Sequence, residues 1–85
     1  MVYLTICLDV FPASMAPAVS APAGLGVQPN WVIAMLHEIR ESCDMAGIEV
    51  ILTEVAELNP SLDSNSQTAA LAARLIYELA DQYYW

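Results

Sequence analysis

Hydrophobic and polar residues are arranged in blocks along this chain, and the blocks predict two strands and two helices. Two short apolar runs are typical of strands, and the first, residues 2–8, is apolar on both faces, which suits a strand buried on both sides in a parallel sheet. After each run, apolar residues recur at helical spacing. The expected elements are a strand over 2–9, a loop over 10–28, a helix over 29–46, a strand over 48–55, a loop over 56–65 and a helix over 66–82. This order predicts a single α/β segment in which a right-handed crossover joins two parallel strands.

Turn-forming residues mark the boundaries of these elements. The first loop is rich in proline, glycine and small apolar residues, which excludes regular structure and predicts a functional loop that packs closely. Pro29 suits the first turn of a helix, and Gly47 suits the residue that ends it. Ser64 with Gln67 fits a capping box at the start of the last helix. The apolar face of that helix is expected to comprise Ala69, Ala72, Ala73, Ile76, Leu79, Ala80 and Tyr83.

Composition changes this picture, because the chain is very apolar for its size. Of its 85 residues, 58% are hydrophobic and 14% are charged, whereas typical domains are about 45–50% apolar. A chain this short has little interior in which to bury such residues. Two strands would also leave two sheet edges unpaired and one sheet face uncovered. We therefore expect a piece of a larger fold or a homo-oligomer.

Charge and cysteine content narrow the class of protein. Ten acidic and two basic residues give a net charge of −8, which argues against nucleic acid and anionic membrane surfaces as partners. No apolar run is long enough to span a membrane, and the start of the sequence lacks the basic region of a signal peptide. Cys7 and Cys43 have neither zinc-site nor disulfide-scaffold spacing, so we expect a reducing, cytoplasmic compartment.

Carboxylates follow both predicted strands and define a candidate site. Asp9 ends the first strand, and Glu54 and Glu57 end the second. The carboxyl ends of parallel strands are where ligands bind in α/β proteins. Cys7 and Asp9, two residues apart on a strand, would point the same way and could offer two ligands to one metal.

Plainer interpretations of these residues stay open. Cys7 can be a buried small hydrophobe beside a turn-forming Asp9, and the two glutamates can be solvated acids at a strand end. The one histidine, His37, lies within a predicted helix, with no second His or Cys at metal-ligand spacing.

Two sequence boxes give the chain a family resemblance. Residues 5–12 (TICLDVFP), followed by 16–22 (APAVSAP), resemble the last metal-binding segment of the ureohydrolases, which include arginase, agmatinase and formimidoylglutamase. In that family an Asp-x-Asp pair ends a strand and a loop with similarly spaced prolines follows. Residues 57–60 (ELNP) resemble the family's Glu-Val-Asn-Pro box. The segments that look closest to formimidoylglutamase are 10–12, 20–23 and 68–75.

The resemblance covers essentially the whole chain and implies a fold and an activity. The fold is the C-terminal β-α-β-α piece of a three-layer α/β/α arginase-like parallel sheet. The activity is hydrolysis of N-formimidoyl-L-glutamate to L-glutamate and formamide in histidine degradation, with two Mn²⁺ ions activating water. Asp9 would be a metal ligand, Glu57 would face the cationic formimidoyl group, and Glu54 would support it less directly. Another ureohydrolase, acting on a guanidino compound as arginase and agmatinase do, is the alternative within the family.

Two departures from the family pattern limit this interpretation. The other family ligands, a His and an Asp-x-His-x-Asp segment, are absent from the sequence, so we expect the isolated chain to be inactive. Cys7 stands where the family has the first Asp of its pair, and Mn²⁺ prefers carboxylates whereas thiolates suit softer metals. Cys7 could be a weaker ligand, could shift the metal preference, or could cost one metal position.

A second hypothesis belongs to another class, a non-catalytic α/β module that self-associates. Its support is the excess of apolar residues together with the missing ligands. A stand-alone metal-binding protein that uses only Cys7 and Asp9 would have too few ligands.

Overall fold

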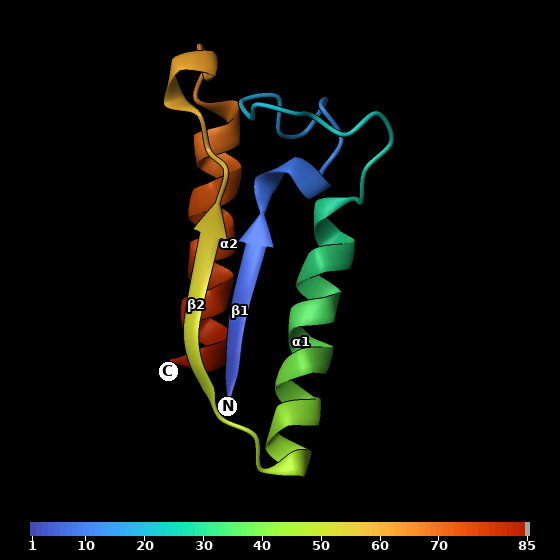
Figure 1. Ribbon diagram of the computed structural model, residues 1–85, viewed down its shortest axis with the longest axis vertical. Coiled ribbons are helices and arrows are strands. Elements are labelled where there is room, and N and C mark those ends of the chain that lie inside the picture. The colour runs from blue at the N-terminus through green and yellow to red at the C-terminus, as the bar shows by residue number, and fades with distance from the viewer. Residues whose placement is uncertain (85) are drawn as a thin grey trace.

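The computed structural model describes residues 1–84 and contains two parallel strands and two long helices in that part of the chain (Figure 1). The elements in chain order are β1 (Val2–Cys7), the 3-10 helix η1 (Leu8–Val10), α1 (Pro29–Ala46), β2 (Val50–Ala56), the 3-10 helix η2 (Pro60–Leu62) and α2 (Gln67–Tyr83). The predicted α/β class and the strand–helix–strand–helix order are confirmed. Neither long helix has the length and apolarity needed to cross a membrane.

The two strands are hydrogen-bonded and parallel, and α1 makes the crossover between them. Their register is regular from Tyr3, which pairs with Leu52, to Cys7, which pairs with Ala56. The last residues of β1 and β2 are therefore partners. Whatever follows the two strands emerges at the same end of the sheet, as Figure 1 shows.

Local sequence explains both ends of α1. Pro29 occupies the first turn, where its missing N–H costs no hydrogen bond. Gly47 ends the helix in a left-handed conformation, with φ of 67°, and its N–H donates to the last turn. The N–H of Ile48 then donates to the carbonyl of Cys43 at 2.8 Å. This bond keeps the chain at the helix end, so β2 begins at Val50, two residues later than expected.

The first strand also ends earlier than its sequence pattern predicts. Extended structure stops at Cys7, because the chain turns into the 3-10 helix Leu8–Val10. Asp9 therefore lies in a turn. The expectation that Cys7 and Asp9 lie on one strand is wrong, so strand alternation does not set the relative directions of their side chains.

The hydrophobic core lies between one face of the sheet, the two helices and the first loop. Its buried side chains are Ile6, Leu8, Phe11, Ala16, Val19, Leu36, Ala72, Leu75, Leu79 and Tyr83. Leu4, Val50 and Val55 add partly buried contacts from the two strands. Helix α1 contributes Leu36 and α2 contributes Leu75 and Leu79, so both helices cover the same core. In Figure 1 the strands lie in front of α2.

The other face of the sheet stays open within residues 1–84. Tyr3 is 55% exposed and Leu52 is 51% exposed on neighbouring strands. The sequence pattern of residues 2–8 predicted a strand buried on both faces, and only one face is covered here. The reason is that α1 and α2 supply one helical layer, and a three-layer fold needs a second layer from elsewhere.

The first loop packs onto the core and onto the start of α2. Ala16 and Ala18 are fully buried, whereas Ala13 and Ala21 are exposed. The side-chain amide of Gln67 donates to the carbonyl of Ser14 at 2.7 Å. Close packing of the loop, expected from its alanines, thus holds for its middle part.

Helix α2 begins differently from the capping box that the sequence suggests. The carboxylate of Asp63 accepts the N–H groups of Thr68 at 3.0 Å and Ala69 at 2.9 Å. Ser66, which precedes the helix, has φ of 60° and makes no side-chain cap. The capping-box prediction for Ser64 was wrong, because the N–H of Gln67, which Ser64 would have capped, donates to Asn65 Oδ1 at 3.1 Å.

Candidate functional site

The candidate carboxylates gather at the carboxyl ends of β1 and β2. Because Cys7 pairs with Ala56, Asp9 follows one strand end by two residues and Glu57 follows the other directly. Asp9 is partly buried in its turn, whereas Cys7 and Glu57 are exposed. The two acidic segments therefore leave the sheet at the same end, its carboxyl end. A ligand at this edge would contact both segments.

Glu54 lies within β2, two residues before its last residue, and on the open face of the sheet. The hydroxyl of Thr5, its neighbour across the sheet, donates to Glu54 Oε1 at 3.2 Å. Hydrogen bonding to Glu54 also raises the pKa of the Tyr3 phenol above its ordinary value. Glu54 is thus tied to polar neighbours on the sheet, and it lies further from the strand ends than Glu57 does.

Glu57 has an unusual backbone conformation for a residue with a side chain. Its φ is 78°, in the left-handed region that L-residues other than Asn and Asp rarely adopt. Within residues 1–84, neither ion pair includes its exposed carboxylate. The residue therefore presents an unpaired negative charge just past the sheet, on a backbone with restricted freedom.

The two basic residues do not neutralise this edge. Arg40 pairs with Asp44 at 3.1 Å on α1, and Arg74 pairs with Glu78 at 2.7 Å on α2. Each arginine is engaged four residues along its own helix. Neither arginine therefore pairs with a strand-end carboxylate, so this end of the sheet suits a cationic ligand.

The described residues do not form a metal centre by themselves. In the range 1–84 no group of three or more His, Cys, Asp and Glu side chains is arranged to hold a metal ion. His37 lies exposed in the middle of α1, away from the strand ends. Cys7 is exposed and Asp9 is partly buried, and no third candidate joins them. A metal held by Asp9 needs ligands from outside these residues.

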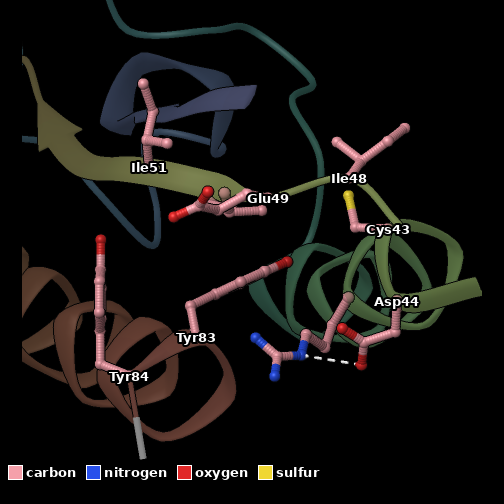
Figure 2. A pocket seen from close by; sticks show the side chains of 9 residues that line it. Cys43, Asp44, Ile48, Glu49, Ile51, Tyr83 and Tyr84 are labelled. Carbon is pink, nitrogen blue, oxygen red and sulfur yellow. Dashed lines mark hydrogen bonds and ion pairs between the residues drawn. The ribbon is translucent and has the colours of Figure 1, made fainter. Parts of the chain in front are cut away.

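A pocket of about 410 Å³ lies at the opposite end of the sheet and is a different feature (Figure 2). It is lined by the last turns of α1 and α2 and by the start of β2. Several of its polar side chains already have structural partners, such as Arg40 with Asp44 and Tyr84 with Thr53. The Tyr83 hydroxyl donates to the carbonyl of Leu36 at 2.8 Å, and the Arg40 guanidinium lies 5.7 Å from the Tyr83 ring centre. These contacts hold α2 against α1, and we interpret the pocket as a gap in the helix packing and not as a ligand site.

One contributor to the candidate edge was not singled out as a site residue from the sequence. The N–H of Asn59 donates to the carbonyl of Ala18 at 2.8 Å, which joins the loop after β2 to the loop after β1. Asn59 lies in the segment that resembles a family box, and that resemblance was its only signal. Its backbone contact depends on how two distant loops pack, which local pattern cannot reveal.

Comparison with known proteins assigns the chain to a class. A family model described as the Arginase family matches residues 1–81. The chain belongs to the arginase family, which confirms the resemblance to the ureohydrolases. The members of this family are hydrolases.

Named relatives and solved structures refine this comparison. The chain is 49% identical over 78 residues to the formimidoylglutamase of Aromatoleum aromaticum, a match that covers 92% of this chain and 21% of that protein. Against the formimidoylglutamase of Aliivibrio fischeri the identity is 46% over 79 residues, covering 92% and 23%. The chain thus spans about a fifth of the length of the curated relatives it matches.

Solved structures confirm the arginase-like fold. Proclavaminate amidino hydrolase from Streptomyces clavuligerus superposes with a TM-score of 0.81 at 27% identity, over 95% of this chain and 25% of that one. The formiminoglutamase of Trypanosoma cruzi, solved with Mn²⁺, superposes with a TM-score of 0.70 at 21% identity, over 89% and 24%. The second likeness concerns the fold alone.

Proposed function

We propose that this chain is the C-terminal portion of a formimidoylglutamase-like hydrolase. The observation that carries the proposal is the pair of acidic strand ends, with Asp9 and Glu57 at one edge of the sheet, in a chain of the arginase family. The identity of 49% to a relative named formimidoylglutamase supports this substrate over the other family substrates. The proposed reaction of the whole protein is hydrolysis of N-formimidoyl-L-glutamate to L-glutamate and formamide.

Glu57 is proposed to bind the cationic end of the substrate. A formimidoyl group carries its positive charge over two nitrogens, and a carboxylate can accept a charge-assisted hydrogen bond from it. Glu57 is exposed and lies outside both ion pairs of residues 1–84, so its carboxylate is available. In the reaction, water adds to the formimidoyl carbon, the bond from that carbon to the glutamate nitrogen breaks, and that nitrogen takes up a proton. Glu54 would support substrate binding less directly, because it lies within β2 and before the strand end.

Asp9 is proposed to supply one carboxylate to a pair of Mn²⁺ ions whose other ligands lie outside this chain. When bound, such ions supply an acidified water as nucleophile. The metal is recorded for the formiminoglutamase of Trypanosoma cruzi. Cys7 is the doubtful member of the ligand pair, because its thiolate suits softer metals than Mn²⁺.

The experiment that tests this proposal uses the whole protein that carries this segment. Asp9→Asn should lower bound metal, measured by elemental analysis, and should lower formamide release by at least about tenfold, the scale expected when a metal site is damaged. Asp81→Asn is the matched control, since Asp81 is an exposed acid on α2, and it should change neither quantity. Unchanged metal content and turnover in Asp9→Asn would contradict the assignment.

A second candidate function, self-association through the sheet, is favoured by a separate observation. An apolar groove of about 380 Å³ runs along the side of β1 that faces away from β2, and it is lined mainly by apolar side chains of β1 and α1. A second copy of the chain could cover this edge, as could the rest of a longer protein. Light scattering on the isolated chain separates the two, because a stable monomer would rule out the self-associating module.

A further inference from the structure

The strained backbone of Glu57 calls for a physical cause. A residue with a Cβ is disfavoured at φ of 78°, where its side chain crowds the following carbonyl. Such conformations persist only where the surrounding structure imposes them, and they occur preferentially at binding and catalytic sites. Glycine would fit this position without strain.

Two fixed points flank Glu57 and impose this conformation. On one side, Ala56 is held by its pairing with Cys7 at the end of the sheet. On the other, the N–H of Asn59 donates to the carbonyl of Ala18 at 2.8 Å. Only Glu57 and Leu58 bridge the gap, so their backbone has little freedom.

The side chain of Asn59 stabilises the second fixed point. Its Oδ1 accepts the N–H of Ser61 at 3.2 Å and the hydroxyl of Ser61 at 2.6 Å. These bonds begin the 3-10 helix Pro60–Leu62 and set the direction in which the chain leaves the strand end.

The acceptor of the Asn59 N–H is also anchored. Ala18 is fully buried, and its own N–H donates to Thr68 Oγ1 at 3.0 Å. A continuous set of contacts therefore runs from α2 through the first loop to the segment that carries Glu57. This set couples the two loops at the candidate edge.

We propose that Asn59 is a positioning residue that holds Glu57 in its left-handed conformation, so that the carboxylate projects from the strand ends toward a cationic substrate. The substrate in this inference rests on the proposed function. The conformation of Glu57 is that of the structure. Asn59 acts through Glu57 and does not contact the substrate.

A kinetic experiment on the whole protein tests the positioning role. Asn59→Ala should raise KM for N-formimidoyl-L-glutamate by about tenfold and leave kcat within about threefold, because it loosens a group that binds substrate before and during reaction. Asn59→Asp keeps the acceptor oxygen and should restore KM. Asn65→Ala is the matched control, since Asn65 Oδ1 accepts the N–H of Gln67 at 3.1 Å in a similar turn, and it should leave KM unchanged.

Equal effects of Asn59→Ala and Asn65→Ala, or an unchanged KM in Asn59→Ala, would overturn the proposal. If the unaltered protein hydrolyses no amidine substrate, the proposed function fails, and a second measurement then decides on the positioning role. That measurement compares the Tm of Glu57→Gly with that of Glu57→Ala, both of which lack the carboxylate.

The glycine variant should melt about 2–4 °C higher than the alanine variant, because only glycine relieves the left-handed strain. In the Asn59→Ala background the difference should shrink to less than about 1 °C, since the segment can then relax. Equal Tm values for the two Glu57 variants in the native background would show that Asn59 imposes no strain, whatever the enzymatic activity.

Discussion

The backbone N–H of Ala18 donates a 3.0 Å hydrogen bond to Thr68 Oγ1, although the two residues are fifty positions apart and both are fully buried. This bond attaches the middle of the first loop to the first turn of α2. It gives a defined path to a segment whose proline and glycine content excludes helix and strand. The loop in turn supplies the carbonyl that Asn59 uses.

We expect Thr68→Val to destabilise the fold by about 1–3 kcal/mol, because it leaves the buried N–H of Ala18 without an acceptor. The free energy of unfolding from denaturant titration measures the effect. Thr68→Ser keeps the hydroxyl and loses one methyl group, so it should cost only about 1 kcal/mol. A loss in Thr68→Val no larger than that in Thr68→Ser would contradict the predicted weight of the hydrogen bond.

Gly26→Ala should destabilise the protein by at least about 2 kcal/mol. Gly26 has φ of 69°, and a Cβ there would lie 2.4 Å from the backbone nitrogen of Pro12. The left-handed backbone alone disfavours alanine by about 1–2 kcal/mol, and a backbone clash cannot be relieved by a rotamer change. Gly24→Ala is the control, since nothing lies within 4 Å of its Cβ. Thermal unfolding of the two variants should differ clearly, and similar Tm values would contradict the prediction.

Stability should fall at high pH through Tyr83. Burial raises the pKa of its phenol above 10.0, so the folded protein favours the neutral form. A raised pKa contributes stability that is complete below about pH 10 and is lost as the pH rises through the raised value. Tyr83→Phe should therefore lose stability less steeply than the unaltered protein between about pH 9 and pH 11.

At neutral pH the same variant loses the hydrogen bond to the Leu36 carbonyl, at a cost of about 0.5–1.5 kcal/mol. Denaturant titrations over the pH series measure both effects. Tyr77→Phe, at a residue that is 59% exposed, is the control variant for the same pH series. A parallel fall in Tyr83→Phe and the unaltered protein would assign the pH effect to other groups.

Cys7→Asp should strengthen Mn²⁺ binding in the whole protein by about tenfold, because a carboxylate oxygen suits Mn²⁺ better than a thiolate. The dissociation constant from metal titration is the measurement, and retention of Cd²⁺ should change in the opposite direction. Cys7→Ser offers no carboxylate and should give no gain. If both variants bind Mn²⁺ like the unaltered protein, residue 7 is not a ligand.

Local sequence predicted the elements of the fold well, and it predicted burial less well. Pro29 and Gly47 bound α1 as expected, and Leu79 and Tyr83 are buried on α2. Ile76, expected on the same face, is 57% exposed, because it lies toward the open edge of β2. The burial of a side chain beside the outer strand depends on what else packs against the sheet there. The hydrophobic pattern of one helix carries no information about such neighbours.

The candidate site also has features that the sequence could predict and features that it could not. The order of strands and acids was enough to place Asp9 and Glu57 at one edge of the sheet. The left-handed backbone of Glu57 and the Asn59–Ala18 bond could not be predicted, because they depend on the path of two loops that meet only in the folded chain. The roles of Asp9, Cys7, Glu54 and Glu57 in metal and substrate binding stay proposals.

The parallel pairing of β1 and β2 also sets an order of events in folding. Val2 pairs with Val50, and the buried bonds of Ala18 and Tyr83 join residues 50 and 47 positions apart. The two helices can begin to form from near neighbours, whereas each of these contacts must first close a long loop. The carboxyl ends of the strands, which carry Asp9 and Glu57, are joined to each other by such distant contacts, the Cys7–Ala56 pairing and the Asn59–Ala18 bond. This end of the sheet should therefore be the last part of the segment to acquire its native shape and the first to lose it.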